Sequence, residues 1–494
     1  MESTLKTLLK PGEGRLRELI QILTGERPAV FRPTEIEVSE ASDLNNSQRE
    51  AVRHILEAQD LAIIHGPPGT GKTTTLVQAV ALLAKVQPGI LVTAPSNTAV
   101  DLLTERLVES GIRVVRIGNI SRVDEKIVEN TLDVLLSAHP ETKNIRKIRI
   151  QAAESRKAAS RYKRNFGFEE REERKRLIRE AKEMSAWAGQ LEDRLIHQIL
   201  ESAEVVTCTL VGAAHPLLDG FHFHTAFVDE AAQALEPANW IPVLKCDKVV
   251  LTGDPFQLPP TVKSQEAARA GLSKTLMEKC LGREALSSML TLQYRMNEAI
   301  MAFSNSWFYG NKLKAAAEVK NHRLQASDNQ PLIFIDTAGC GFEEETKQHQ
   351  QSKFNKGECH ILYEHLYSMY GEFPPELIPE MAVISPYMEQ VLFIREFLEE
   401  TELGTILPVT VSTIDGFQGQ ERDVVYISLV RSNDRGKIGF LDDIRRMNVA
   451  MTRARKQLVV IGDSATIGQH SFYEAFLEHC EAHDAYRSAW EYMS

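Results

Sequence analysis

The stretch Leu61-Ala62-Ile63-Ile64-His65-Gly66-Pro67-Pro68-Gly69-Thr70-Gly71-Lys72-Thr73 joins an apolar run to a loop of the pattern G-x-x-x-x-G-K-T. The apolar run predicts a strand, and the residues after the loop predict a helix. The glycines let backbone N–H groups turn inward and surround phosphate oxygens. Lys72 is placed to reach the β- and γ-phosphates of a nucleotide, and Thr73 to bind Mg²⁺. The stretch therefore predicts a P-loop nucleotide-binding domain.

A second, acidic motif lies further along the chain. The run Phe227-Val228-Asp229-Glu230-Ala231-Ala232 is an apolar strand that ends in two adjacent carboxylates. Asp229 is suited to hold the Mg²⁺ shell, and Glu230 to orient and activate the attacking water. The alternative is an acid pair that caps the next helix, which the P-loop in the same chain disfavours.

Four further residues fit the chemistry of phosphoryl transfer. Gln257, in the segment 253–260 after another strand, can sense the γ-phosphate, and Asp254 can join the metal network. Arg295 and Arg453 are candidates for the cations at the γ-phosphate, because the planar fork of arginine binds phosphate through two hydrogen bonds. For each residue taken alone, a polar turn or a surface salt bridge is the competing interpretation.

Alternating helices and strands predict an α/β fold with two parallel sheets. The charged stretch from Asn144 to Ala203, almost free of Gly and Pro, predicts a helical hairpin with a bend at 165–167. The expected domains are an N-terminal helix (Arg15 to Leu23) and linker in 1–43, a first ATPase domain in 44–101 and 204–282, a helical insertion in 102–203 and a second sheet domain in 283–494. Apolar runs that predict strands lie at 61–64, 89–94, 205–208, 226–229, 248–251, 332–335, 381–384, 409–412, 424–429 and 458–461.

Charge is distributed unevenly along the 494 residues. The whole chain carries a net charge of −11, yet Lys143 to Lys182 contains 15 Lys and Arg against 6 Asp and Glu. One basic region on an acidic body predicts a local contact with a polyanion. The alternative is a solvated helical face on which glutamates pair with the basic residues at i,i+4.

The composition, with 43% hydrophobic and 25% charged residues, is typical of a soluble globular protein. No apolar run approaches the roughly 18 residues of a membrane span, and the N-terminus lacks the layout of a secretory signal. The six dispersed cysteines form no C-x-x-C pair, so we expect neither a zinc site nor a disulfide framework. A reducing cytoplasm, no membrane contact and a monomer are expected.

Eight motifs in family order resemble those of superfamily 1 helicases of the 5′-to-3′ type, in the group that contains the regulator of nonsense transcripts, immunoglobulin mu-binding protein 2 and senataxin. The resemblance runs from about Leu44 to Asp463. The segments that carry it are 44–48 (the adenine-reading Q motif), 66–73 (motif I), 93–101 (Ia), 229–232 (II), 253–260 (III), 292–296 (IV), 411–421 (V) and 445–455 (VI).

This resemblance implies two RecA-like lobes that close on ATP and Mg²⁺. Gln48 would then select adenine, Tyr294 would stack on or near the base, and Glu421 would help hold the nucleotide from the second lobe. The resemblance places the other nucleotide contacts at Gly66, Gly69, Thr70, Gly71, Lys72, Thr73 and Thr74. It also implies movement 5′ to 3′ on single-stranded DNA or RNA.

Contacts with the single strand are expected at strand ends, from hydroxyl, amide and apolar groups that touch the backbone of any sequence. Base–aromatic stacking, which also tolerates any sequence, is expected at Pro386 and Tyr387. An ordinary turn hydrogen bond is the alternative for each Ser or Thr. The polar candidates are Ser96, Asn97, Thr207, Thr209, Ser412 and Thr413.

Family members usually carry a small β-barrel ahead of the Q motif. Only 43 residues precede Leu44, so we expect that this chain lacks the barrel, which bears on strand separation. Two other interpretations remain open at this point. One is a nucleic-acid clamp that binds ATP without turnover, and the other is a small-molecule P-loop kinase, which would leave the second sheet domain unexplained.

Overall fold

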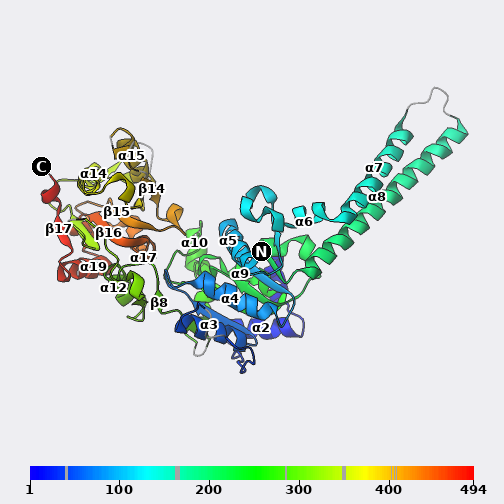
Figure 1. Ribbon diagram of the computed structural model, residues 1–494, viewed down its shortest axis with the longest axis horizontal. Helices are drawn as coiled ribbons and strands as arrows, with labels where there is room; N and C mark the ends of the chain where they lie inside the picture. Colours follow the sequence, from blue (N-terminus) through cyan, green and yellow to red (C-terminus); the bar gives the residue numbers. More distant parts are fainter. Residues whose placement is uncertain are drawn as a thin grey trace.

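Two parallel β-sheets form the two lobes of the protein, and a long helical arm projects from the first lobe on the side away from the second (Figure 1). The computed structural model describes residues 1–38, 43–161, 167–283, 286–326, 328–347, 352–401, 403–404, 407 and 409–493. A strand lies at each apolar run that the sequence predicted, with ends that differ by a few residues, so the α/β fold with two parallel sheets is confirmed.

The first sheet has the strand order β3-β4-β2-β5-β6-β1-β7, with all neighbours parallel. Alternate residues of β1 contribute to two separate apolar clusters, Leu61 and Ile63 to one and Ala62 and Ile64 to the other. Both faces of the sheet are therefore covered by helices, as expected for a parallel sheet. The strands are β1 (Leu61–His65), β2 (Ile90–Ala94), β3 (Val114–Ile117), β4 (Val205–Thr209), β5 (Phe223–Val228), β6 (Cys246–Gly253) and β7 (Ser287–Met289).

The N-terminal segment packs into the first lobe and does not form a separate domain. Leu19, Ile22 and Leu23 are buried in one of its apolar clusters, and Arg15 pairs with Asp60 at 2.5 Å. Helix α1 was not predicted. The helices of this lobe are α1 (Glu2–Leu9), α2 (Arg15–Thr24), α3 (Asn46–Glu57), α4 (Lys72–Ala84), α5 (Asn97–Glu109), α9 (Glu236–Val243), α10 (Gln265–Ala267) and α11 (Leu276–Cys280).

The helical insertion is shorter than predicted. Strand β3 lies within the expected insertion 102–203, yet it pairs with β4 in the first sheet. In the sequence, Arg116 interrupts the apolar pattern of this strand. In the structure, its guanidinium is buried and pairs with Asp101 at 2.9 Å. The other domain boundary, at 282, also moves, because β7 pairs with β1.

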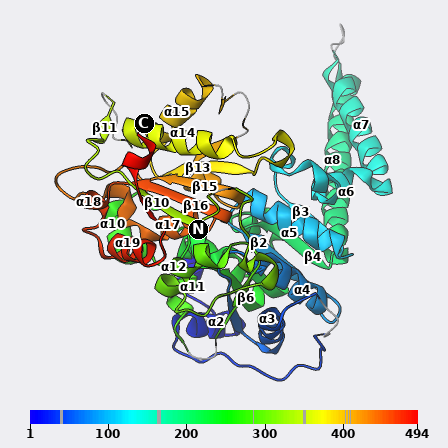
Figure 2. The same ribbon diagram turned by 60° about the vertical axis from the view of Figure 1, so that its left-hand side comes forward.

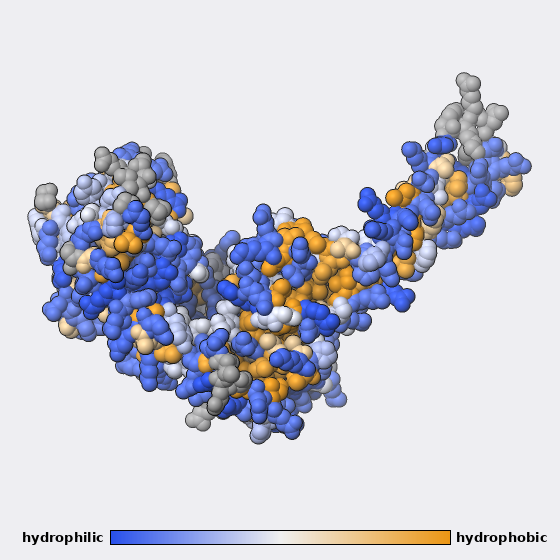
Figure 3. Space-filling view, in the orientation of Figure 1, coloured by the Kyte–Doolittle hydropathy of each residue, from blue (hydrophilic) through white to orange (hydrophobic). Residues whose placement is uncertain are grey.

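The arm consists of α7 (Pro140–Ser160) and α8 (Phe168–Ser202), joined to the lobe through α6 (Leu132–Ala138). Figures 1 and 2 show α7 and α8 side by side, and a small cluster that includes Ile145, Ile148 and Leu195 lies between them. The predicted hairpin is confirmed, although residues 162–166 of its bend lie outside the described residues. Much of the arm's visible surface is hydrophilic (Figure 3).

The second sheet has the order β14-β13-β15-β16-β10-β17, again with parallel neighbours. Its strands are β10 (Leu332–Asp336), β13 (Met381–Ser385), β14 (Val409–Thr413), β15 (Arg422–Ser428), β16 (Ala454–Gly462) and β17 (Tyr486–Ser488). Two small sheets pair β8 (Leu292–Gln293) with β9 (Lys314–Ala315) and β11 (Glu345–Thr346) with β12 (Lys353–Phe354). The helices are α12 (Glu298–Phe308), α13 (Ala317–Lys320), α14 (Lys356–Tyr370), α15 (Met388–Glu399), α17 (Ile444–Met451), α18 (Ser464–Ile467) and α19 (Ser471–Ala482).

The two lobes share one topology. When β3 is set aside, the strands of each sheet follow the same spatial order relative to their order in the chain. Strands β10, β15 and β16 thus correspond to β1, β5 and β6 of the first lobe. Within the described residues, no helix combines the length and the apolar character needed to cross a membrane.

A buried acid beneath the second sheet makes the stability of this lobe sensitive to pH. Glu358, in the first turn of α14, is fully buried, and its Oε2 accepts hydrogen bonds from the Ser428 hydroxyl (2.6 Å) and the Val430 N–H (2.9 Å). Burial raises the pKa of Glu358 to about 8. The folded protein therefore keeps a proton on this carboxyl at pH values where the unfolded chain has released it.

We expect the Glu358→Gln variant to be less sensitive to alkaline pH than the wild type. A raised carboxyl pKa contributes stability that falls as pH rises from the unfolded pKa to the folded one. Between pH 6 and pH 9 the wild type should lose about 2–3 kcal/mol more than the variant. Urea unfolding of both proteins at the two pH values measures this, and equal losses would contradict it.

Candidate active site in the cleft between the lobes

The P-loop sits at the carboxyl end of β1 and leads directly into α4. Gly69 and Gly71 have φ angles of +73° and +75°, a region that side chains other than glycine rarely adopt. A Cβ at Gly69 would also lie 2.7 Å from the Cβ of Arg295. The glycines are thus required both by the turn of the loop and by the close approach of the segment that carries Arg295.

Lys72 faces the acid pair at the end of β5. Its Nζ lies 2.5 Å from Glu230 Oε1 and 3.6 Å from Asp229 Oδ1, and the Thr252 hydroxyl donates to Asp229 Oδ1 at 2.7 Å. Burial alone would lower the pKa of Lys72, but the two carboxylates outweigh it and raise that pKa. The ammonium is therefore charged, and it compensates the acids until a phosphate competes for it.

Glu230, the predicted water-activating residue, is held by hydrogen bonds in an unusual backbone conformation. Burial raises its pKa above the ordinary value, while the Lys72 charge opposes the rise. Its backbone is left-handed, with a φ of +52°, which is unusual outside glycine and clusters at functional sites. The Gln233 amide holds the second carboxylate oxygen at 2.7 Å. Glu230 is thus fixed with one oxygen on Lys72 and the other on Gln233.

Thr73 and Asp229, the predicted Mg²⁺ ligands, both line this cleft. A hydroxyl and a carboxylate are hard oxygen donors, which suit Mg²⁺. Within the described residues, no group of three or more His, Cys, Asp or Glu is placed to hold a metal. Mg²⁺ commonly takes only one or two carboxylates and completes its shell with phosphate oxygens and water, so the residues present fit this ion.

The cleft has a volume of about 810 Å³ and is lined from both lobes. The first lobe contributes the P-loop, Asp229, Glu230 and Gln257, and the other side contributes Arg295 and Arg453. The structure therefore brings both arginines to the Lys72 pocket, as the sequence predicted. This meeting of a P-loop, a buried carboxylate and two arginines is what phosphoryl transfer needs.

The two arginines are held by the second lobe. Arg295 donates from Nε to Glu421 Oε2 at 2.5 Å and from a terminal nitrogen to the Thr452 carbonyl at 3.2 Å. Arg453 is buried, and its burial together with the nearby Arg295 charge lowers its pKa to about 10. It remains protonated at neutral pH, and its buried Nε has no hydrogen-bond partner among the described residues.

The predicted adenine-binding residues lie beside the P-loop and outside the lining of the cleft. The Gln48 amide donates to the Thr70 carbonyl (2.9 Å) and accepts from the Asn45 N–H (3.0 Å), so it braces the loop. The Tyr294 hydroxyl accepts from the Asn45 side chain at 3.0 Å. Glu421 holds Arg295, and Thr74 points away into solvent at the start of α4. A direct contact of these side chains with the base stays a prediction.

The predicted strand-binding residues fall at the carboxyl edges of both sheets. In the first lobe, Ser96 follows β2 and Thr209 ends the neighbouring β4. In the second lobe, Pro386 follows β13 and Thr413 ends β14, with Ser412 one residue earlier. Asn97 begins α5, where its side-chain oxygen accepts from Arg116 at 3.0 Å. Their contact with nucleic acid stays a prediction.

Three assignments need correction. Thr207 is fully buried in β4, where its hydroxyl meets that of Thr104 at 2.8 Å, so it is not available to a strand. Tyr387 is 2% exposed and lies under the ring of Phe440. Asp254, expected in the metal network, is buried among hydrogen-bond donors and does not line the cleft.

A buried polar relay, which the sequence did not reveal, connects the P-loop strand to α17, the helix that precedes Arg453. Asp254 accepts from His65 (3.1 Å), Gln257 (2.8 Å) and the Tyr309 hydroxyl (2.9 Å). The Asn448 amide, from α17, donates to the same hydroxyl at 2.9 Å. No motif spacing marks this relay, since Tyr309 and Asn448 join it only where the two lobes meet.

The comparisons with known proteins agree with this geometry. Two family models, each described as an AAA domain, match residues 43–265 and 272–465. The chain is 33% identical to the DNA polymerase alpha-associated DNA helicase A of Saccharomyces cerevisiae, over 97% of this chain and 74% of that protein. It is 32% identical to an uncharacterized ATP-dependent helicase of Methanocaldococcus jannaschii, over 88% of this chain and 70% of that protein. The chain belongs to the superfamily 1 helicases.

Within that family, the chain is also similar to the DNA-binding protein SMUBP-2 of Mus musculus. The two are 38% identical over all of this chain and 50% of that protein. The chain therefore spans about half the length of the SMUBP-2 relatives that it matches.

We expect Tyr309→Phe to lower turnover more than ATP binding, because the hydroxyl joins Asp254 of one lobe to Asn448 of the other. The kcat of the ATPase should fall about tenfold, with KM for ATP within about twofold of the wild type. Steady-state phosphate release measures both constants.

Tyr473→Phe is the matched control for this prediction. It also removes a buried hydroxyl of the second lobe, one that donates to the Leu441 carbonyl at 2.9 Å. Each variant should lose about 1 kcal/mol of stability, so a kcat that falls equally in both would show that Tyr309 matters only for folding.

Proposed function

We propose that this protein hydrolyses ATP with Mg²⁺ in the cleft between its lobes and uses the energy to move 5′ to 3′ along a single-stranded nucleic acid. The observation that carries the proposal is the meeting of Lys72, Glu230 and the two arginines in one cleft formed by both lobes. A kinase acting on a small molecule would not need the second lobe at its phosphate site.

Each group in the cleft has a distinct part in this reaction. The P-loop N–H groups and Lys72 hold the phosphates, and Glu230 orients the water that attacks the γ-phosphorus. Arg295 and Arg453 meet the charge that develops on the transferred phosphoryl group, a contribution of about 10³–10⁵ in rate for such arginines. Mg²⁺, held through Thr73 and Asp229, would neutralise charge on the β- and γ-phosphates.

Hydrolysis can alter how the lobes bind a strand, because Arg295 and Arg453 of the second lobe contact the γ-phosphate that the first lobe holds. When the γ-phosphate leaves, Arg295 and Arg453 lose their shared anion, and the two carboxyl edges are free to shift relative to each other. Ser96 and Thr209 lie on one edge, and Pro386 and Thr413 on the other. The direction of movement rests on the resemblance of the motifs to the 5′-to-3′ type.

DNA is the first candidate for the strand, since the names of two of the relatives described above refer to DNA. RNA is the comparison, because a 2′-hydroxyl contact would be needed to tell the two apart. All six cysteines lie in described residues and are free, which supports a reducing, cytoplasmic setting. We propose a monomer as the acting unit.

Glu230→Gln tests the proposed hydrolysis. We expect kcat to fall at least about 100-fold, since Gln cannot accept a proton from water, while affinity for ATP and for a strand is retained. Phosphate release is measured with and without oligo(dT) and oligo(U) of equal length.

Glu236→Gln makes the same chemical change outside the cleft, at a side chain paired with Lys279, and should behave as the wild type. Normal turnover in Glu230→Gln would remove Glu230 from its role. A wild-type ATPase that neither oligonucleotide stimulates would argue against a motor.

Strand binding should weaken as salt rises, because each phosphate contact releases counterions. For a single strand, the slope of log K against log salt is about −0.7 per phosphate neutralised. Fluorescence anisotropy of a labelled oligonucleotide between about 50 and 300 mM NaCl measures the slope. A flat response would contradict a groove that follows the backbone.

A further inference from the structure

A polar pocket lies at the carboxyl edge of the second sheet, at the position that corresponds to the nucleotide cleft of the first. It has a volume of about 650 Å³, and its lining includes Glu344, Lys353, Arg431, Arg435, Lys437 and Asp463. Arg431 follows β15, and Asp463 follows β16. These strands correspond to β5 and β6, which end at the ATP cleft of the first lobe.

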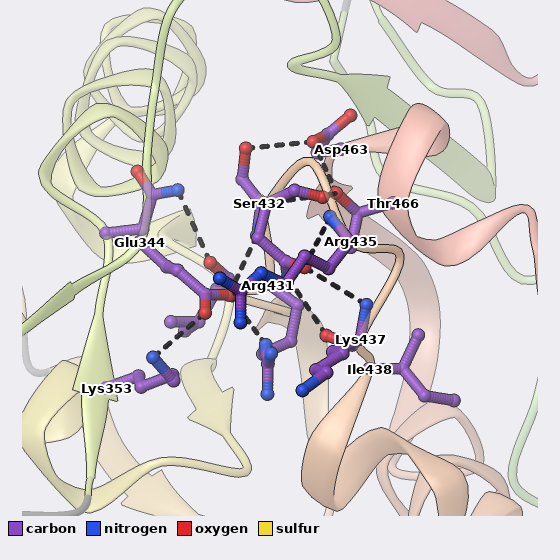
Figure 4. A network of polar contacts seen from close by, with 12 residues as sticks. Glu344, Lys353, Arg431, Ser432, Arg435, Lys437, Ile438, Asp463 and Thr466 are labelled. Atoms are coloured by element: carbon purple, nitrogen blue, oxygen red, sulfur yellow. Dashed lines mark hydrogen bonds and ion pairs between the residues drawn. The ribbon is translucent and has the colours of Figure 1, made fainter.

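The donors in this pocket converge on one carboxylate, that of Glu344 (Figure 4). Its Oε2 accepts from Arg431 Nε (2.6 Å), the Ser432 N–H (3.2 Å) and the Asn433 side-chain amide (3.2 Å). Its Oε1 pairs with Lys353 Nζ at 2.9 Å. One carboxylate is thus surrounded by a guanidinium, an ammonium, a backbone N–H and an amide. A donor set of this kind binds phosphate groups.

The backbone that presents these donors is fixed in a strained shape. Val430, directly before Arg431, has a φ of +72°, which is a marked outlier for a β-branched residue. The buried Glu358 carboxyl accepts from the Val430 N–H, and the Asn355 amide donates to its carbonyl at 3.4 Å. Strain of this kind persists where surrounding groups enforce it, commonly at binding sites. The direction of Arg431 is therefore set before any ligand arrives.

The pocket is continuous with the edge where a strand is expected. A terminal nitrogen of Arg431 donates to the Tyr387 hydroxyl at 3.3 Å. The ring of Phe440 lies 5.5 Å from that of Tyr387 and is 58% exposed. Phe440 thus presents the exposed aromatic surface that the sequence analysis had assigned to Tyr387. Arg435 and Lys437 are exposed on the loop that leads to Phe440 and line the pocket, as does the exposed Asp434 between Arg431 and Arg435.

We propose that this pocket is a phosphodiester-binding subsite for the single strand on the second lobe. A backbone phosphate takes the donors that Glu344 now occupies, Arg435 and Lys437 neutralise the neighbouring phosphate charge, and Phe440 stacks on an adjacent base. Glu344 acts as the resident anion that a strand must displace. The inference rests on the proposed function, since it extends the path of the same strand beyond the edge residues.

The first test removes the exposed cations. Arg435→Gln/Lys437→Gln should bind labelled oligo(dT) about tenfold more weakly than the wild type at about 100 mM NaCl. The slope of log K against log salt should be smaller by about 1. Lys10→Gln/Lys85→Gln makes the same change of charge at exposed residues of the first lobe, after α1 and after α4, and should match the wild type. Equal binding by both double variants would overturn the proposal.

The second test separates stacking from charge. Phe440→Ala should weaken binding about tenfold through the loss of base–aromatic stacking, with the salt slope unchanged. Phe440→Tyr, which keeps an aromatic face, should restore most of the affinity. Loss of affinity in both variants, or a changed slope in Phe440→Ala, would contradict a stacking platform.

The third test concerns Glu344. Glu344→Gln removes the competing charge, so binding should tighten about threefold, whereas a residue that only supports the fold would weaken binding when replaced. If inorganic phosphate alone stabilises Glu344→Gln against heat while the Arg435/Lys437 variant binds the strand normally, the pocket takes free phosphate and the strand subsite is wrong. Failure of the wild type to bind any strand would instead refute the proposed function.

Discussion

Burial of opposite charges between the lobes is the constraint on which the active site depends. Lys72, Asp229, Glu230 and Arg453 are all largely removed from water, and a buried charge is costly unless it is paired. Lys72 compensates the two carboxylates, and Glu421 pairs with Arg295, whereas Arg453 lies buried beside the Arg295 cation. The second-lobe side of the cleft therefore favours an additional anion near Arg453. In the proposed function, the γ-phosphate of ATP is that anion.

The hydrogen-bond relay through Asp254 connects the cleft to both lobes. Asp254 keeps a low pKa in spite of its burial, because His65 and Gln257 donate to it. Gln257 lines the cleft and donates to Asp254 Oδ2, the same oxygen that accepts from the Tyr309 hydroxyl, which in turn accepts from Asn448 in α17. Movement of Gln257 therefore cannot be independent of the helix that precedes Arg453. A buried hydrogen-bond network of this kind favours a small number of discrete arrangements.

Periodicity and motif order predicted both sheets and most of the nucleotide cleft, because apolar strands and glycine loops are local signals. The failures lie where the decisive contact is distant in sequence. Thr207 and Thr209 look alike in the chain, but the alternation of a strand buries the first and leaves the second at the edge. Tyr387 was predicted to stack on a base, yet it is buried, and the ring of Phe440, 53 residues later, lies against it. Strand β3 was not predicted, because an arginine inside a buried strand is expected only where its acidic partner, here Asp101, is known.

The shared topology of the lobes shows how little of the chemistry the fold itself decides. In the first lobe, β1 is followed by a short glycine loop, and the helix that follows presents Lys72 to the cleft. In the second lobe, β10 is followed by a longer segment that folds Glu344 back into the corresponding position. The acid satisfies the donors around Arg431 internally, as Glu230 satisfies Lys72. Both edges thus hold an anion site behind a resident carboxylate, and an incoming phosphate must compete with that carboxylate in each.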